Sequence, residues 1–365
     1  MTTASMNRRI LLARRPWGAP VPDDFRLVEE PLPAPGAGEV LCRTVWLSLD
    51  PYMRGRMNEG PSYAANVGLG EVMTGETVAE VIESRSPDFR PGDVVAGFGN
   101  WQSHFCLPAE KLRKLDPAAA PLSTALGVLG MPGMTAYTGL LAIGRPKPGE
   151  TVVVGAAAGA VGAVAGQIAK LKGCRVVGVA GGPEKCTYVE RELGFDVCLD
   201  RREPDLAARL EAACPRGVDI YVELVGGELF RAVLPLMNLF GRIPVIGGIA
   251  HYNATALPDG PDRTPLLMRQ ILIRRLTLRG MIVWDFADME ADFRRDVAGW
   301  IRAGRLRWRE QVTDGLETAP TALIGMLEGR NFGKQLVRVG PEPAGRLGTG
   351  PDSGTAGGPA RGKAG

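Results

Sequence analysis

The sequence predicts an α/β protein in which a small barrel or sandwich of short strands precedes a doubly wound parallel sheet. Its 365 residues are enough for two domains of ordinary size. Glycine (49) and proline (29) are frequent, which favours turn-rich β structure over a helical bundle. Near Leu122 the hydrophobic pattern changes from short, separated strands to alternating strands and helices.

The first part of the chain consists of short apolar and β-branched runs between turn-forming segments. The predicted strands are 9–13, 25–30, 39–49, 77–83 and 94–96. Short strands at such spacing favour a small barrel or sandwich.

The middle of the chain alternates between strand and helix patterns. The predicted strands are 151–154, 175–180, 219–223, 242–246 and 277–283, and the predicted helices are 159–172, 184–193, 228–238 and 265–275. This alternation is typical of βαβ units around a parallel sheet that is covered on both faces. The last 25 residues, 341–365, are rich in glycine and proline and are predicted to be disordered.

A glycine loop, 155–162 (GAAAGAVG), follows the first parallel strand and opens its helix. Ala157, Gly159 and Gly162 fit the G-x-G-x-x-G pattern, with alanine in place of the first glycine. Gly159 would let the backbone approach a pyrophosphate, and Gly162 would allow close packing of helix on strand. Small residues also serve helix packing alone, but the strand–turn–helix context favours a dinucleotide site.

The end of the second strand distinguishes NAD from NADP. NAD-binding folds usually place an acidic residue there, and 175–180 ends without one. The absence of an acid, together with Lys185, favours a 2′-phosphate. A solvated lysine is an equally good interpretation of Lys185.

Charge and cysteine content exclude several classes of protein. The net charge is +3 with no basic stripe, so no nucleic-acid partner is expected. The six cysteines form no C-x-x-C pair, and we expect reduced thiols and no metal. The N-terminus has no secretory pattern, and glycines interrupt the most apolar stretch, 151–169. The sequence therefore predicts a cytoplasmic protein without a membrane span.

Six ordered blocks resemble the medium-chain dehydrogenase/reductase superfamily, in particular its zinc-free prostaglandin/leukotriene reductase and alkenal double-bond reductase branch. The blocks are 47–57 (LSLDPYMRGRM), 130–137 (GMPGMTAY), 156–174 with its glycine loop, 225–227 (VGG), 252–253 (YN) and 331–334 (NFGK). The resemblance implies a GroES-like barrel domain, 1–126 and 301–340, and a Rossmann domain, 127–300. It also implies a homodimer formed through the last Rossmann strand, about 277–284.

The resemblance further implies NADPH as the cofactor. With the glycine loop and the chain's own Arg201, the predicted cofactor contacts are Met131, Thr135, Ala157, Gly159, Val161, Gly162, Gly182, Lys185, Arg201, Val225, Gly248, Tyr252, Val283 and Asn331. Tyr52 and Trp284 are predicted to line the substrate pocket, although Tyr52 fits a barrel core equally well.

The implied reaction is reduction of the C=C bond of an α,β-unsaturated ketone or aldehyde. Hydride addition to the β-carbon places negative charge on the carbonyl oxygen, which a positioned donor stabilises. Tyr252 matches the tyrosine to which the family assigns this role, and its phenol stays protonated at neutral pH. His251 is predicted to be an exposed histidine, with a proton relay as the less favoured alternative.

Arg54 and Arg56 admit two interpretations, an anchor for an acidic substrate group or ion pairs with Asp50 and Glu59. We favour the ion pairs. The chain also departs from the family pattern in Glu223-Leu224, where relatives often have Asp-Asn, in Asp200-Arg201-Arg202, and in Trp284. Arg201 could supply a bidentate phosphate contact.

Three other functions stay open on sequence alone. They are a reductive cyclase that acts on a conjugated polyene by the same hydride chemistry, an NADP-linked alcohol dehydrogenase, and a non-catalytic NADPH-binding protein.

Overall fold

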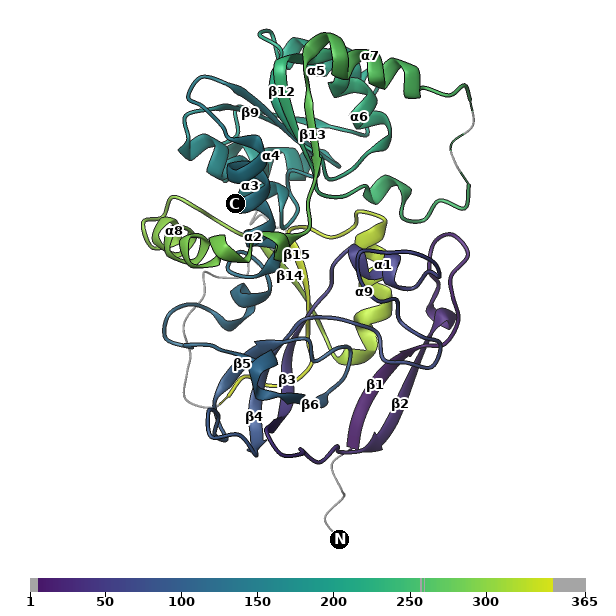
Figure 1. Cartoon of the computed structure of the whole chain (residues 1–365), viewed down its shortest axis with the longest axis vertical. Helices are drawn as coiled ribbons and strands as arrows, with labels where there is room; N and C mark the ends of the chain where they lie inside the picture. Colours follow the sequence, from purple (N-terminus) through teal and green to yellow (C-terminus); the bar gives the residue numbers. More distant parts are fainter. Residues whose placement is uncertain (1–5, 257, 259, 344–365) are drawn as a thin grey trace, which may run out of the picture.

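The computed structural model describes residues 6–256, 258 and 260–343. Within these ranges two main sheets form the cores of two domains (Figure 1). The lower domain in this view contains the first strands, in purple and blue, and the last strands, in yellow. The upper domain contains the middle of the chain, in teal and green. Most of the predicted disordered tail, from residue 344 onward, lies outside the described residues.

The upper domain contains a six-stranded parallel sheet. Its strands are β8 (Thr151–Val154), β9 (Arg175–Ala180), β10 (Val197–Asp200), β11 (Val218–Val222), β12 (Met237–Val245) and β13 (Thr277–Gly280). They lie in the order β10-β9-β8-β11-β12-β13, and all their pairings are parallel. This is the order 3-2-1-4-5-6 of a Rossmann fold, so the predicted doubly wound sheet is confirmed.

Helices alternate with the strands of this sheet along the chain and cover the sheet. They are α2 (Met131–Thr138), η4 (Gly139–Gly144), α3 (Gly162–Leu171), α4 (Pro183–Arg191), α5 (Leu206–Ala213), α6 (Gly227–Val233), η5 (Leu234–Leu236), η6 (Ile249–His251), α7 (Thr264–Arg274), η7 (Val283–Met289) and α8 (Glu290–Arg302). Val152, Val153 and Val154 of β8 are fully buried, as expected of a central parallel strand covered on both faces.

The lower domain is predominantly antiparallel. Its strands are β1 (Met6–Leu12), β2 (Phe25–Pro31), β3 (Glu39–Ser48), β4 (Thr77–Ser84), β5 (Val94–Gly97), β6 (His104–Pro108), β7 (Arg113–Lys114), β14 (Glu310–Asp314) and β15 (Lys334–Arg338). Its helices are η1 (Pro22–Asp24), α1 (Tyr52–Arg56), η2 (Ala109–Lys111), η3 (Leu122–Leu126), η8 (Leu316–Thr318) and α9 (Ala319–Leu327). β1 pairs with β2 in a separate ribbon.

The chain returns to this domain at its end. β15 pairs antiparallel with β3, and β14 lies beside β15, so the last strands complete a sheet that the first strands began. The sheet runs β14-β15-β3-β4-β5-β7, with β6 also paired to β3. The combination of this domain with a Rossmann sheet confirms the predicted fold class. The exact domain boundaries, 126/127 and 300/301, stay predictions.

Several predicted elements have different limits in the structure. The helix predicted at 159–172 begins only at Gly162, because the glycine loop continues to that residue. The helix predicted at 228–238 ends at Val233, where Pro235 permits only a short 3-10 turn. The strand predicted at 277–283 ends at Gly280, and a 3-10 helix begins at Val283.

Candidate active site

The glycine loop lies between β8 and α3, at the carboxyl edge of the sheet where the strand order reverses. Ala156 has a positive φ of 46°, and the Gly159 N–H donates to the Ala156 carbonyl over 2.8 Å. A Cβ added at Gly162 would lie 2.4 Å from that carbonyl oxygen. Glycine is therefore required at 162 for the turn to close, and α3 begins there with its N-terminus at the turn.

Ala157 is placed differently from the other loop residues. Its side chain is fully buried, and its N–H donates to the Val179 carbonyl over 3.0 Å. A Cβ added at Gly178 would lie 2.8 Å from the Ala157 Cβ, so strand and loop are in close contact here. Ala157 thus anchors the turn to β9. Gly159 and Val161 are only partly buried.

Three cationic residues, Lys185, Arg201 and Arg202, gather at the carboxyl ends of β9 and β10, and we call them the cationic cluster. A Cβ added at Gly181 would lie 3.2 Å from Arg201 Nε, and one added at Gly182 would lie 3.1 Å from Arg202 Nη1. Burial lowers the pKa of Lys185, and the neighbouring Arg202 and Arg201 lower it further. The sequence predicted contacts from Lys185 and Arg201 but missed Arg202.

Asp200 ties the two turns that carry the cationic cluster. Its Oδ1 accepts the backbone N–H groups of Gly182 (2.8 Å) and Arg202 (2.9 Å). Burial raises the pKa of Asp200, but these hydrogen bonds outweigh it and lower that pKa overall. The carboxylate is thus held by backbone donors, and the three side-chain cations beside it suit a dianionic phosphate.

The segment before β15 brings the lower domain to the glycine loop. Gly333 forms an isolated β-bridge with Gly159, and Lys185 Nζ donates to the Gly329 carbonyl over 2.8 Å. Asn331 lies within this segment, and its Nδ2 donates to the Gly333 carbonyl over 2.9 Å. The structure therefore brings Asn331 and Lys185 to the same edge of the Rossmann sheet as the loop.

Glu223, one residue after β11, holds the turn that contains Val225. Its buried carboxylate accepts the N–H groups of Val225 (2.6 Å) and Gly226 (2.7 Å). Burial nevertheless raises its pKa. Leu224 stands where an amide is expected, and the bracing comes instead from this neighbouring acid. An acidic residue directly after a buried strand was the signal for it in the sequence.

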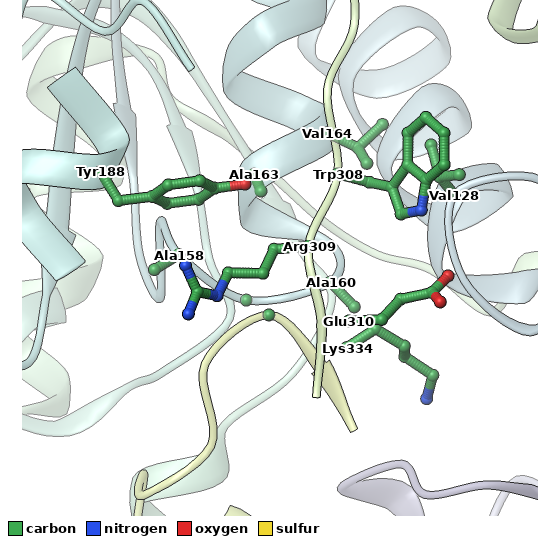
Figure 2. A pocket seen from close by; sticks show the side chains of 12 residues that line it. Val128, Ala158, Ala160, Ala163, Val164, Tyr188, Trp308, Arg309, Glu310 and Lys334 are labelled. Carbon is green, nitrogen blue, oxygen red and sulfur yellow. The ribbon is translucent and has the colours of Figure 1, made fainter. Parts of the chain in front are cut away.

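A small hollow lies beside the glycine loop, between α3 and the segment that leads into β14 (Figure 2). Its lining includes Ala158, Ala163 and Trp308. The Arg309 guanidinium lies 3.9 Å from the ring centre of Phe332 and 5.7 Å from that of Tyr188. The residues that line this hollow do not include those predicted for the substrate.

Tyr252 follows η6 in the loop after β12 and is half-buried. A Cβ added at Gly247 would lie 3.4 Å from its hydroxyl oxygen. Burial raises the pKa of Tyr252, and the nearby Gly248 backbone opposes the rise. The phenol is therefore protonated at neutral pH and available as a donor at the carboxyl edge of the sheet.

Tyr252 belongs to a set of neighbouring aromatic side chains that come from four segments. The set consists of Tyr52, Tyr63, Tyr252 and Trp284, and we call it the aromatic group. The rings of Tyr63 and Trp284 are 5.6 Å apart. The Arg56 guanidinium lies 5.0 Å from the ring centre of Tyr63 and 5.8 Å from that of Tyr52. Tyr252 adds to the rise that burial causes in the Tyr63 pKa, so these two phenols are neighbours.

Sequence reasoning missed Tyr63. It lies in an irregular loop between α1 and β4, where no periodic pattern marks a residue as buried or functional. Tyr63 and Trp284 are each about half exposed, at 52% and 51%. The structure thus brings the predicted pocket residues together from both domains and adds one.

The predicted ion pairs of Arg54 and Arg56 are wrong. Arg54 donates to neutral oxygens, and Arg56 donates to the Ala65 carbonyl over 2.8 Å. Glu59 pairs instead with Arg15 (2.8 Å), and Asp50 with Lys334 (2.7 Å). Both acids had a closer cation from a segment distant in sequence.

The Asp50–Lys334 pair is buried and supports the start of α1. Lys334 Nζ also donates to the Leu49 carbonyl over 2.7 Å, and Ser48 donates to the Asp50 carboxylate. This contact ties the segment that contains Asn331 to the segment that contains Tyr52. Burial raises the pKa of Tyr52 well above its usual value, and the charge of Asp50 adds to the rise.

The other predicted residues lie on α2 and after the last two strands of the sheet. Thr135 and Met131 are on α2, with Thr135 Oγ1 donating to the Met131 carbonyl over 2.8 Å. Val283 begins η7, after the last strand. His251 is exposed, and its Nε2 accepts the Gly227 N–H over 3.1 Å, so it braces the neighbouring loop.

Within residues 6–256, 258 and 260–343, no group of three or more His, Cys, Asp or Glu side chains is placed to hold a metal ion. The prediction of a metal-free protein stays a prediction. The helices of this part of the chain include none that is long and apolar enough to cross a membrane.

The Rossmann sheet, the glycine loop with its cationic cluster and the phenols beside them define a two-domain, dinucleotide-dependent oxidoreductase. Two family models match the chain, "N-terminal domain of oxidoreductase" over residues 8–115 and "Zinc-binding dehydrogenase" over residues 160–298. The chain is 55% identical over 334 residues to the NADPH-dependent curcumin reductase of Escherichia coli, an alignment that covers 91% of this chain and 97% of that protein.

Two further relatives agree with this match. Prostaglandin reductase 1 of Bos taurus is 42% identical over 327 residues, with 88% of this chain and 96% of that protein covered. The crystal structure of CurA from Vibrio vulnificus in complex with NADPH is 49% identical, with a TM-score of 0.89 and coverage of 92% and 99%. The chain belongs to the medium-chain dehydrogenase/reductase superfamily, in its zinc-free prostaglandin reductase and alkenal reductase branch.

Proposed function

We propose that the protein reduces the conjugated C=C bond of α,β-unsaturated ketones or aldehydes with NADPH. The observation that carries this proposal is the position of Tyr252, a protonated phenol at the carboxyl edge of a Rossmann sheet, in a chain 55% identical to an NADPH-dependent curcumin reductase. Tyr252 thus places a hydrogen-bond donor for a carbonyl oxygen at the edge of a dinucleotide-binding fold.

The residues around the glycine loop fit NADPH. A Cβ at Gly162 would overlap the Ala156 carbonyl and distort the turn that must receive a pyrophosphate, and α3 begins there with the positive end of its dipole. The cationic cluster of Lys185, Arg201 and Arg202 fits the 2′-phosphate, which NADH lacks. Asn331 and Gly333 approach the loop from the lower domain and would cover the cofactor there.

The remaining predicted contacts complete this assignment. Val225 and Gly248 belong to the two loops that face the end of the cofactor nearest Tyr252, and Val283 lies after the last strand. Met131 and Thr135 lie on α2, which packs against α3. Val161 and Gly182 contribute backbone at the two turns.

When bound, NADPH supplies the hydride that the β-carbon of the substrate receives. Negative charge then develops on the substrate's carbonyl oxygen, and the Tyr252 hydroxyl donates a hydrogen bond to it. Burial raises the pKa of Tyr252, so its proton is retained until the enolate forms. The same phenol can then supply the proton that completes the saturated product.

The aromatic group favours a flat, conjugated substrate. Tyr52, Tyr63 and Trp284 offer ring faces and edges, and the Arg56 guanidinium lies against two of these rings. Arg54 is unavailable to a substrate, because its donors are directed at protein oxygens. This arrangement supports recognition by stacking more than by a salt bridge.

We further propose that the protein is a cytoplasmic homodimer joined through β13. This strand lies at the edge of the Rossmann sheet, where its outer backbone groups can pair with a second copy. Exposed apolar side chains lie nearby, including Leu239 and Phe240 on β12 and Leu272 on α7. The six cysteines, all in the described part of the chain, are unpaired, which suits a reducing compartment.

The test is NADPH consumption against a panel of 2-alkenals, an enone-containing prostanoid, curcumin and a conjugated polyene, with NADH as control and product structures by NMR. Preference for NADPH with saturated, uncyclised products supports the proposal. A cyclised polyene product would indicate a reductive cyclase, and oxidation of alcohols with NADP⁺ a dehydrogenase. NADPH binding without turnover of any substrate would overturn the enzymatic assignment.

A further inference from the structure

Arg54 is a buried cation held by neutral oxygens from both domains. It lies on α1 and is 3% exposed. Its Nη2 donates to the Gly18 carbonyl (2.7 Å) and its Nη1 to Asn58 Oδ1 (2.6 Å). Its Nε donates to Asn253 Oδ1 (3.2 Å). Within the part of the chain that the structure describes, no carboxylate lies within ion-pair distance of this guanidinium.

Among these acceptors, Asn253 belongs to the Rossmann domain, and it directly follows Tyr252 in the chain. The two loops also touch at Gly18, which has a φ of 81°. A Cβ added there would lie 3.4 Å from Thr255 Cγ2 and 3.7 Å from the Asn253 carbonyl oxygen. The loop that carries the phenol therefore contacts the loop 16–18, and Arg54 is hydrogen-bonded to both loops.

We propose that Arg54 and Asn253 form a clamp between the two domains that fixes the position of the Tyr252 hydroxyl. This inference rests on the donor role proposed for Tyr252. Arg54 and Asn253 are positioning residues, because they act on the reaction only through the neighbouring tyrosine.

The physical reason lies in what a buried guanidinium requires. A buried cation with no carboxylate in direct contact keeps its place only while its N–H groups are accepted, so each acceptor is held in a defined direction. Asn253 offers one neutral oxygen to this array, and its backbone continues directly into Tyr252. A donor must sit within hydrogen-bond reach of the carbonyl oxygen, and small displacements cost much of the rate.

The first test compares two asparagines that accept from the same guanidinium. Asn253→Ala removes the acceptor in the Rossmann domain, whereas Asn58→Ala removes one within the domain of Arg54 itself. We expect kcat for an enone to fall roughly 10-fold in N253A and to stay within about two-fold in N58A. The Kd for NADPH should stay unchanged in both, and the thermal unfolding temperature should fall by a similar amount in both, because each variant leaves one buried guanidinium N–H without its acceptor. An unchanged kcat in N253A would overturn the clamp.

Two further variants keep the test decisive if N253A does not fold. Asn253→Asp retains the oxygen that Arg54 contacts, and Asn253→Leu retains the volume without an acceptor. The clamp requires N253D to keep at least about half of the wild-type kcat and N253L to lose as much as N253A. Equal kcat values in N253D and N253L would overturn it.

A double-mutant cycle with Tyr252→Phe shows whether the clamp acts through the phenol. If it does, N253A should cost roughly 10-fold in the wild-type background but less than about two-fold in Y252F. Equal losses in both backgrounds would mean that Asn253 acts elsewhere, and the clamp would fail. Failure of the proposed function is distinguishable, since Y252F alone would then retain the full kcat.

Discussion

The two sides of the proposed site are built in different ways. On the Rossmann side, the glycine loop is one continuous segment, and its turn is closed by contacts between its own residues Ala156, Gly159 and Gly162. On the other side, the aromatic group comes from four segments of two domains, and its members meet only in the folded chain. A local motif suits a ligand whose shape does not change, such as a dinucleotide, whereas separate, exchangeable loops suit the recognition of a substrate.

The largest expected effect separates chemistry from binding. Tyr252→Phe removes the hydroxyl that stabilises the enolate, and we expect kcat to fall roughly 100-fold. The Kd for NADPH should stay unchanged, because the glycine loop is intact. Stopped-flow and steady-state rates with an enone measure this effect. Tyr137→Phe is the matched control, since that hydroxyl donates to Asp296 over 2.8 Å beneath α8 and should affect stability alone.

The complementary change acts on the continuous loop. In Gly162→Ala the new Cβ meets the Ala156 carbonyl at 2.4 Å, and the turn must open to relieve the overlap. An overpacking penalty of about 2 kcal/mol would weaken NADPH binding roughly 30-fold. Gly299→Ala is the control, because a Cβ on that helical glycine meets nothing within 4 Å and alanine favours the helix. Equal Kd values in the two variants would contradict the steric account of the loop.

The same contrast explains what the sequence could predict. Strand alternation and the glycine loop are local patterns, so the Rossmann sheet and residues such as Gly159 and Gly162 were predictable. The resemblance supplied Tyr52 and Tyr252, whose motifs are short but ordered along the chain. Tyr63 was not predictable, because only the fold brings its irregular loop to Trp284.

The ion pairs failed for a related reason. Arg54 and Arg56 were assigned to acids nearby in sequence, whereas Lys334 and Arg15 reach those acids through pairings of distant segments. Asp200 and Arg202 lie in a stretch for which the sequence predicted no strand, whereas β10 ends at Asp200 in the structure. Their joint role depends on the hydrogen bonds that link the ends of β9 and β10, and strand neighbours are set by topology.

Cofactor preference gives a smaller effect on the Rossmann side. Lys185→Ala removes one cation of the cluster, and a lost charge-assisted hydrogen bond of about 1.5 kcal/mol weakens NADPH binding roughly 10-fold. Binding of NADH, which has no 2′-phosphate, should change less than about two-fold. Fluorescence titration with both cofactors measures the ratio. Arg191→Ala, an exposed arginine at the other end of α4, should leave it unchanged, and equal losses for both cofactors would exclude Lys185 as the specificity residue.

The smallest expected effect concerns how each side responds to pH. Glu76 lies directly before β4, close enough to Tyr52 for its charge to raise the pKa of that tyrosine. Burial and the nearby Asp50 raise the pKa of Glu76 itself to about 7, from an ordinary value of 4.5. A raised carboxyl pKa stabilises the fold below about pH 4.5, and this stability is lost as the pH rises through about 7. Glu76→Gln should therefore raise Tm by roughly 4 °C at pH 8 and change it little at pH 4.5.

Asp200, on the Rossmann side, has a lowered pKa and therefore the opposite effect on stability, which is present at neutral pH and lost in acid. Asp200→Asn should accordingly lower Tm at pH 8, and Tm measured from pH 4 to 8 tests both variants. A change of the same sign in E76Q and D200N at pH 8 would contradict the assignment of opposite pKa shifts to the two sides.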